Sequence, residues 1–309
     1  MSDNLNSLRT LLHSTPSREV WRLIIEQIDA EPSPVSIGYA QELLTRWPDD
    51  LRVTTSLHEV MPPSWPLSRY LSLYTRFFDG TLSLLQNIDQ LAHITHLDLS
   101  FNSSLSSIDL SEIISLPHLK PRVLLAQSCH LRERFLEPMN ASCALQLEHL
   151  DLSSARLHPD NTRWLAAPHR FPELVSLNLA ANSIAALDHR FIYTPLPSLT
   201  SLGLSDNPLN RKTFSSLCAS PLRQKLHVLL LLRCQIDDHA LKLLFQSQIN
   251  SNLKVLDLRL NPFSADALLK HLEAPGVESL DTIRIDRACF EEISHLAPAH
   301  PLLSRLNPS

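Results

Sequence analysis

The stretch Leu253-Lys-Val-Leu256-Asp-Leu258-Arg-Leu-Asn261-Pro-Phe263 decides the fold, because its spacing of apolar residues recurs along the chain. In each copy three apolar anchors come first, spaced as Leu253, Leu256 and Leu258 are here. A small or polar residue follows at the position of Asn261. The last position of the eight copies is Asn102, Cys129, Ala155, Asn182, Asn207, Cys234, Asn261 and Ala288. Successive copies lie 25 to 27 residues apart. A fixed period of this length predicts a solenoid of stacked repeats.

This pattern resembles the leucine-rich repeat, L-x-x-L-x-L-x-x-N/C-x-L. Between the copies, apolar pairs such as Phe214/Leu217 and Leu241/Leu244 are three residues apart, which is typical of a helix. The period of 25 to 27 residues and the predicted helices between the copies together resemble the ribonuclease-inhibitor type of repeat. The resemblance implies an α/β solenoid with a curved parallel sheet on the concave side and a mostly helical convex side. It covers about residues 91–296, an array of about eight repeats.

Departures from the repeat pattern also predict local structure. Pro121 and Ala126 replace apolar anchors in the second copy. Ala155 and Ala288 lack the amide group with which Asn bonds the backbone, so we expect the row of asparagines to be interrupted there. The tail, residues 297–309, contains three prolines, and we expect it to fold over the last repeat or fray without extending the sheet.

Residues 1–90 lack the repeat and predict an N-terminal all-helical domain. Thr15 followed by Pro16 is expected to begin a helix whose inner face carries Trp21, Ile24, Ile25 and Ile28. Further helices are expected from about residue 36, over 67–78 and from 81 to about 90. The first strand of a repeat array leaves an apolar end and an unpaired edge, so we expect this domain to cap the array. A separate binding role is the alternative.

Composition restricts the class of partner and the compartment. The formal charge is -5 and the pI is near 6.3, which argues against a nucleic-acid partner. Neither a cleavable signal nor a membrane-spanning stretch is recognisable, so we expect a cytoplasmic protein without membrane contact. The alternative is an effector secreted without a cleaved signal. The five cysteines are scattered, which favours reduced thiols over disulfides.

The sequence carries no recognisable catalytic, cofactor or metal motif. His96-Leu-Asp98 and His149-Leu-Asp151 are similar tripeptides, but a whole repeat separates them, a distance of about 10 Å in a parallel sheet. With four glycines the chain has little material for a phosphate-binding loop. Cys129 occupies a position expected to be buried, which makes it a poor nucleophile. We therefore expect no enzyme activity, no metal and no cofactor.

Residues that alternate with the anchors are predicted to face the concave side, where equivalent positions of successive repeats lie about 4.8 Å apart. Small residues line the middle repeats, and an apolar patch of Val228, Leu230, Leu232 and Val255 lies beside them. Exposed apolar surface often marks a contact site, although a covering segment would explain the patch equally well. The candidate protein-binding residues are Ser153, Ser176, Asn178, Ser201, Asp206, Val228, Leu230, Leu232, Arg233, Val255, Asp257, Arg259, Leu260, Arg284 and Arg287.

Charged residues follow the apolar patch on the same face. Three pairs of opposite charge are expected in neighbouring strands, and they are Asp206 with Arg233, Asp257 with Arg284, and Arg259 with Asp286. Such pairs form either a self-satisfied ladder or a surface that recruits a charged partner. Arg287 is expected to have no acidic neighbour.

These observations predict a non-enzymatic, monomeric scaffold that binds a protein partner on its concave face. The alternative is an adaptor whose N-terminal helices recruit a second protein, either of the ubiquitin-ligase type or as an injected bacterial effector. The segment from Pro16 to Ile25 is similar to the start of an F-box, but the usual Leu-Pro opening is absent. An inhibitor of a cytoplasmic enzyme is a third possibility, by analogy of fold alone.

Overall fold

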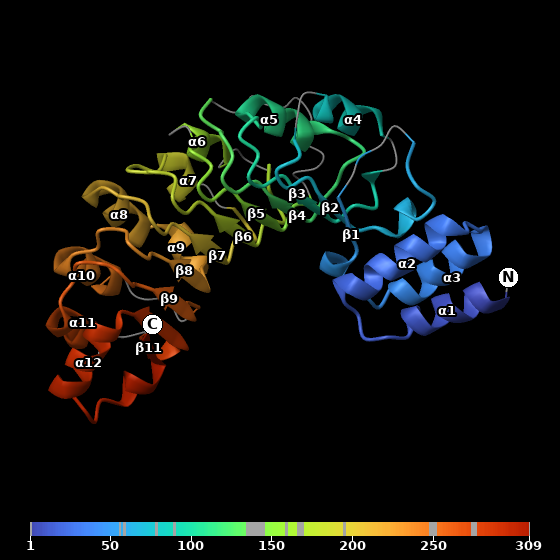
Figure 1. Ribbon diagram of the computed structural model, residues 1–309. Coiled ribbons are helices and arrows are strands. Elements are labelled where there is room, and N and C mark those ends of the chain that lie inside the picture. Colours follow the sequence, from blue (N-terminus) through green and yellow to red (C-terminus); the bar gives the residue numbers. More distant parts are fainter. Residues whose placement is uncertain are drawn as a thin grey trace.

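The computed structural model describes residues 2–308 except 56, 58–59, 78–79, 89–90, 134–145, 158–159, 166–169, 194–195, 247–251 and 273–276. The chain forms an arc, with strands along its inner side, helices along its outer side and a group of three helices at the N-terminal end (Figure 1). Leu136 and Met139, which the period predicts for the convex side of a repeat, and Phe78, expected in the buried surface of the N-terminal domain, lie outside the described residues.

The N-terminal helices are α1 (Ser2–Leu12), α2 (Arg18–Ala30) and α3 (Pro34–Leu44). They enclose a core of their own, which includes Trp21, Ile24 and Ile28 and is separate from the core of the repeats. The expected start of α2 at Pro16 is wrong by two residues. Ser17 caps this helix by accepting the N–H of Val20, as Ser, Thr, Asp or Asn does at many helix starts.

Eleven parallel strands form one sheet in the order in which they occur along the chain. They are β1 (Val53–Thr54), β2 (Tyr70–Ser72), β3 (His96–Asp98), β4 (Val123–Leu125), β5 (His149–Asp151), β6 (Ser176–Asn178), β7 (Ser201–Gly203), β8 (Val228–Leu230), β9 (Val255–Asp257), β10 (Thr282–Ile285) and β11 (Leu306–Pro308). The middle anchors pair in the expected register, as Leu229 opposite Leu256 shows. These leucines are buried, because they point away from the concave face into the core.

Two expectations about the ends of the sheet are wrong. Residues 70–72 form β2 and not part of a helix, because Leu71 and Leu73 repeat the apolar spacing and Leu71 pairs with Leu97. The tail also extends the sheet, since Leu306 pairs with Ile283. Its prolines do not prevent this, because Pro308 is the last residue of an edge strand and needs no ladder N–H there.

The convex side is helical, as the spacing of apolar pairs predicts (Figure 1). Its helices are α4 (Thr81–Asn87), α5 (Ser107–Ser115), α6 (Asn161–Leu165), α7 (His189–Tyr193), α8 (Arg211–Cys218), α9 (Pro221–Lys225), α10 (Asp238–Gln246), α11 (Ala265–His271) and α12 (Arg287–Leu296). Phe214 and Leu217 of α8 are buried, and so are Leu241 and Leu244 of α10. Each helix therefore covers its repeat with one apolar face.

From β2 to β9, the chain leaves each strand through a residue in the left-handed region, although none of these residues is glycine. They are Thr75, Phe101, Ser128, Ser154, Ala181, Asp206, Arg233 and Leu260, with φ between 52° and 60°. Such a conformation costs a non-glycine residue on the order of 1–3 kcal/mol. Cross-repeat hydrogen bonds offset this cost, as from Ser154 N to Ala180 O at 2.8 Å and from Asp206 N to Leu232 O at 2.7 Å.

Asparagine side chains satisfy the backbone beneath these turns. Asn207 is fully buried, and its amide nitrogen donates to the carbonyls of Leu179 and Leu204, both at 2.9 Å. Its oxygen accepts the N–H groups of Asn182 and Ile184 at 3.0 and 2.9 Å. Asn102, Asn182 and Asn261 make equivalent bonds, and the thiols of Cys129 and Cys234 donate one bond each at 3.2 Å.

The two alanines in this position behave differently from each other. Ala155 is buried and has no side-chain donor, but Asn182 of the next repeat supplies one to the carbonyl of Leu152 at 2.8 Å. Ala288 lies within α12, because in the last repeat a helix follows the strand directly. The bond from Asn182 to Leu152 is the usual bond of a repeat asparagine to the preceding strand, as Asn207 makes to Leu179, so the row of side-chain donors is interrupted at Ala155 as expected.

A buried arginine joins the helical domain to the sheet. Arg52 is 3 % exposed, and its guanidinium donates to the carbonyls of Leu67 and Leu44. Burial, and next the neighbouring Arg69, lowers the pKa of Arg52 to about 10, so it is still charged at neutral pH. Trp21 Nε1 donates to Val53 O at 2.8 Å, which ties α2 to the first strand. The helical domain is thus fixed against the end of the sheet.

Replacing Asn207 by alanine tests the role of the buried amide. Asn207→Ala is expected to lower the free energy of unfolding by about 2–4 kcal/mol, because it leaves two carbonyls and two N–H groups without their partner. The measurement is the urea midpoint followed by circular dichroism. The matched control is Asn252→Ala, which removes an exposed amide with one 3.3 Å bond. Equal losses in the two variants would contradict this role.

Candidate functional site

The concave face consists of the residues that flank the buried anchor in each strand. One column, by the pairing of the strands, is His96, Val123, His149, Ser176, Ser201, Val228, Val255 and Thr282. The next column is Asp98, Leu125, Asp151, Asn178, Gly203, Leu230, Asp257 and Arg284. Both columns match the surface expected from the sequence.

The candidate binding residues lie on or just beyond these strands. Ser176, Asn178, Ser201, Val228, Leu230, Val255, Asp257 and Arg284 belong to β6–β10. Ser153, Asp206, Leu232, Arg233, Arg259 and Leu260 follow their strands in the turns. Arg287 is the exception, because it is the first residue of α12.

Small side chains form a trough in the middle of the concave face. Ser176 and Ser201 are half-buried register partners on β6 and β7. Gly203 is buried beneath the side chain of Asn178, and a Cβ built on it would come within 2.7 Å of Asn178 Oδ1. Glycine is therefore required at 203 as long as Asn178 keeps its position.

Carboxylate and amide side chains of the second column mostly have a structural role. The side-chain oxygens of Asp98 and Asp151 accept the N–H two residues further on, both at 2.9 Å, and Asn178 does the same at 3.1 Å. Asp151 also accepts bonds from Gln127 at 2.8 Å and from Asn178 at 3.0 Å. These acceptors end the strands and are largely occupied, so they have few lone pairs left for a ligand.

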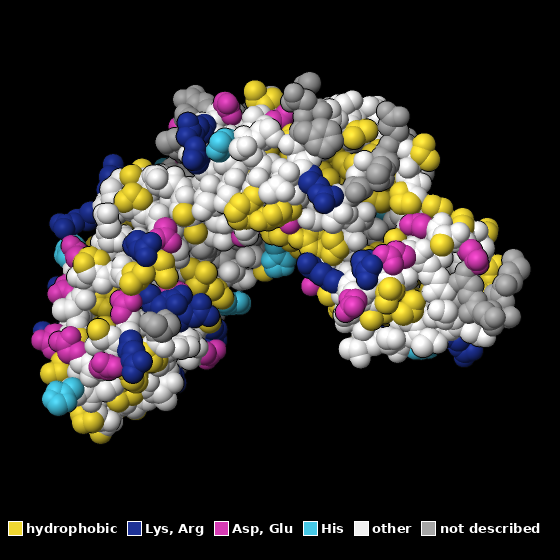
Figure 2. Space-filling view, viewed as in Figure 1, with side chains coloured by type: hydrophobic (Ala, Val, Ile, Leu, Met, Phe, Trp, Pro, Cys, Tyr) yellow, Lys and Arg dark blue, Asp and Glu magenta, His cyan; other side chains and the backbone are white. Residues whose placement is uncertain are grey.

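An apolar patch adjoins the trough on β8 and β9. Val228, Leu230, Leu232 and Val255 are each half-buried, and Val228 is the register partner of Val255. Figure 2 shows hydrophobic side chains along the inner edge of the arc. Surface of this kind favours contact with another protein.

The charged pairs follow the expectation in part. Arg233 Nη1 lies 2.8 Å from Asp206 Oδ1, and Arg284 Nη1 lies 3.7 Å from Asp257 Oδ2. Arg259 donates two hydrogen bonds to Asp257, at 2.9 and 2.6 Å, within its own repeat. Asp286, expected beside Arg259, accepts the N–H of Leu260. The expectation for Arg287 is wrong, because its Nε lies 2.9 Å from Glu291 one helical turn away.

The sequence reading missed an aromatic cluster at the N-terminal end of the concave face. Tyr70 lies beside His96 with ring centroids 5.5 Å apart, and its hydroxyl donates to Asp98 at 3.2 Å. Burial, and next the charge of Asp98, raises the pKa of Tyr70 to about 12. Tyr74 and Phe101 are 46 % and 47 % exposed, and their ring centroids lie 4.9 Å apart with the planes tilted by 42°. The leucine spacing of β2 could have revealed this cluster, because β2 lies one repeat before the first copy that was recognised in the sequence.

This cluster borders a cavity of about 400 Å³ between the helical domain and the sheet. Arg18 of α2 lies 5.9 Å from the Tyr70 ring, and Arg76 donates to Thr55 O at 2.9 Å. Both arginines line the cavity together with Tyr70 and Tyr74. The concave face therefore extends onto the helical domain.

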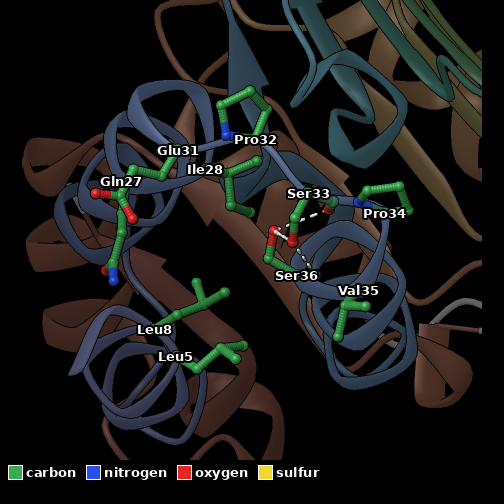
Figure 3. Close-up of a pocket in the computed structure, with 10 residues that line it drawn as sticks. All are labelled: Leu5, Leu8, Gln27, Ile28, Glu31, Pro32, Ser33, Pro34, Val35 and Ser36. Carbon is green, nitrogen blue, oxygen red and sulfur yellow. Dashed lines mark hydrogen bonds between the residues drawn. The ribbon is translucent and has the colours of Figure 1, made fainter. Parts of the chain in front are cut away.

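A second cavity, of about 530 Å³, lies within the helical domain (Figure 3). Its lining is mostly apolar and includes Leu5 and Leu8 of α1, Ile28 of α2 and Val35 of α3. Leu5 and Val35 are 39 % and 69 % exposed. The cavity is thus open to an apolar group from outside.

The described residues offer little for catalysis. They contain no group of three His, Cys, Asp or Glu side chains placed to hold a metal ion. Cys129, Cys218, Cys234 and Cys289 are free, and burial raises the pKa of Cys129 to about 11 and that of Cys234 to about 12. Thiols of this kind are poor nucleophiles near neutral pH. In the same part of the chain, no helix has the length and apolar character needed to cross a bilayer.

Parallel strands on the concave side, helices on the convex side and 25 to 27 residues per turn define a leucine-rich-repeat solenoid fold. No protein-family model and no curated protein matches the sequence.

Many solved structures are similar to it, and three of them illustrate the likeness. Internalin C2 of Listeria monocytogenes is 20 % identical over 72 % of this chain and 82 % of that one, with a TM-score of 0.47. A second internalin of the same organism is 21 % identical over 79 % and 68 %, with a TM-score of 0.44. A Bacteroides fragilis protein is 15 % identical over 76 % and 74 %, with a TM-score of 0.53. At these identities the likeness concerns the fold alone.

Titration of His96 provides a test of the concave face at its N-terminal end. Burial lowers the pKa of His96 below its ordinary value of 6.5, so the native state binds fewer protons than the unfolded state just below pH 6.5. This contribution to stability is present above pH 6.5 and is lost as the pH falls. His96→Gln is expected to show a smaller fall in Tm between pH 7.5 and 5.5 than the wild type. The control His239→Gln removes an exposed imidazole of α10, and an equal change there would contradict the assignment.

Proposed function

We propose that this chain is a non-enzymatic scaffold that binds a protein partner on its concave face, from the third to the seventh repeat. The observation that carries this proposal is the half-buried apolar patch of Val228, Leu230, Leu232 and Val255 beside a trough of small residues. A trough lets the backbone of a partner approach closely, and the patch supplies the apolar area that stabilises a contact.

The construction of the face supports the same function. Its backbone is fixed by the cross-repeat bonds and by buried asparagines such as Asn207 and Asn261. A surface that is already ordered loses little conformational entropy on binding. Repeat solenoids provide extended concave surfaces suited to large ligands, which favours a protein over a small molecule.

We further propose that the protein acts as a monomer in a reducing compartment such as the cytoplasm. Three of the four described cysteines are buried and all four are free thiols, an arrangement typical of reducing surroundings. The charge of -5 argues against nucleic acid as the principal partner.

Charge placed in the apolar patch tests the proposed function. The double variant Leu230→Asp with Leu232→Asp is expected to lose the partner captured by the wild-type chain, at least about a hundredfold in affinity, because two buried apolar contacts become desolvated carboxylates. Affinity is measured by surface plasmon resonance, and folding by circular dichroism. Ile108→Asp is the matched control, since Ile108 is 42 % exposed on the convex helix α5. Unchanged binding in the double variant would exclude the patch.

A second candidate function is that of an adaptor whose helical domain recruits another protein. The apolar cavity between α1, α2 and α3 supports it, because a capping role alone does not require an open cavity of about 530 Å³. Leu5→Glu with Val35→Glu is expected to abolish recruitment without affecting the concave face. The control is Val60→Glu, at a residue that is 85 % exposed and outside this cavity. Equal recruitment by both variants would exclude the adaptor.

A further inference from the structure

We propose that the C-terminal part of the concave face binds an acidic peptide segment of the protein partner, through Arg233, Arg259 and Arg284. This inference rests on the proposed function and specifies the chemistry of the partner. The three arginines belong to consecutive repeats, at β8, β9 and β10, and we call them the arginine cluster. Figure 2 shows Lys and Arg side chains gathered where Figure 1 places β8 and β9.

Asp206 and Asp257 are less exposed than the arginines with which they pair, and the acidic residues of this region are already bonded. The side chain of Asp257 is 4 % exposed and accepts two bonds from Arg259, at 2.9 and 2.6 Å. Asp286 accepts the N–H of Leu260 at 2.9 Å. Asp206 is 31 % exposed and accepts a bond from Arg233 at 2.8 Å. The carboxylate oxygens of these aspartates therefore accept hydrogen bonds from groups of the protein itself.

The guanidinium groups of Arg233 and Arg284 are exposed and keep donors for a ligand. The side chain of Arg233 is 63 % exposed. Among the described residues, it donates one hydrogen bond, to Asp206. Arg284 is 42 % exposed, and in the same part of the chain its ion pair with Asp257 at 3.7 Å is longer than a hydrogen bond. Each guanidinium has five N–H donors. The surface thus presents unused cationic donors although its formal charges nearly cancel.

The spacing of the cluster fits an extended peptide. Neighbouring strands are about 4.8 Å apart, so Arg233 and Arg284 are separated by roughly 10 Å across the sheet. Arg233 also stands three positions beyond Leu230, the residue in the column of Arg284, so the cluster runs diagonally across the face. About four residues of an extended chain span this diagonal, so carboxylates two residues apart reach successive arginines. Leu260, which is 50 % exposed, and the apolar patch border the cluster. A segment with acidic and apolar residues therefore complements this end of the face.

Nucleic acid fits the same region less well. A duplex or a single strand carries one phosphate per nucleotide, and its affinity comes from many cations acting together. Here three arginines alternate with three aspartates on a chain of charge -5. Carboxylates at chosen positions can pair with guanidinium groups in the bidentate geometry that arginine favours.

Binding of a labelled peptide tests the inference. The probe is a fluorescein-labelled ten-residue peptide of alternating glutamate and serine, titrated with the full chain at low salt and followed by fluorescence anisotropy. The double variant Arg233→Gln with Arg284→Gln is expected to raise Kd about tenfold or more, and added NaCl is expected to weaken wild-type binding. Arg259 is retained so that buried Asp257 keeps its partner.

The control is Arg211→Gln, which removes an arginine whose side chain is 73 % exposed from the convex helix α8. It is expected to leave Kd within about twofold of the wild type. An equal loss in the control, or no loss in the double variant, overturns the inference. Tighter binding of a ten-residue oligothymidylate than of the peptide, lost in the same double variant, also overturns it, because the cluster then binds polyanions in general.

Failure here can be distinguished from failure of the proposed function. If the peptide does not bind while Leu230→Asp with Leu232→Asp still abolishes capture of the partner, the acidic chemistry is overturned and the proposed function stands. If the peptide binds through the two arginines but that apolar-patch variant keeps its partner, the chemistry is supported and the proposed function fails.

Discussion

The chain leaves the sheet at the same point of every repeat, and the backbone groups exposed there must find partners away from water. A buried side chain, Asn or Cys, supplies the donor at this point in six of the eight repeats read from the sequence. It bonds its own strand and the strand before it, as Asn207 does with Leu204 and Leu179. Unsatisfied buried carbonyls would otherwise cost about 1–3 kcal/mol each. This bond fixes the stacking on which the sheet and its concave face depend.

Regular stacking also determines which groups the concave face can offer to a partner. Asp98, Asp151 and Asn178 accept backbone N–H groups at the ends of their strands, so much of the face's acceptor capacity is used internally. The groups that remain available to a partner are the half-buried serines, the apolar patch and the exposed guanidinium groups. The face is therefore better suited to a protein surface than to a small ligand held by many polar contacts.

Much of the fold could be predicted because the leucine spacing has a fixed period. The register of the strands follows from the same spacing, because a shift by one residue would place the leucine anchors on the wrong face of the sheet. The concave columns follow directly from that period. β2 was missed because Ser68 stands where an apolar anchor was expected, and β11 because prolines surround a strand of three residues. Neither segment contains enough of the repeat pattern to be recognised from the sequence, and each is identified as a strand only by its pairing with the adjacent strand of the sheet.

Side-chain partners and cavities could be predicted less well. From the columns, Arg259 was expected to pair with Asp286 and Arg287 to have no acidic neighbour. Their bonds to Asp257 and Glu291 depend on side-chain rotamers and on the helix α12 that replaces the usual turn. The aromatic cluster at Tyr70 and the two cavities depend on how α1–α3 lie against the sheet. Buried contacts such as those of Arg52 set that arrangement, and no local spacing encodes them.

The most direct test of the account is site-specific photo-crosslinking to the partner. A diazirine-bearing leucine analogue placed at position 230, on the concave strand β8, is compared with the same analogue at position 108, on the convex helix α5. Binding on the concave face predicts a crosslinked complex from position 230 and none from position 108. Crosslinking from position 108 with none from position 230 would contradict it.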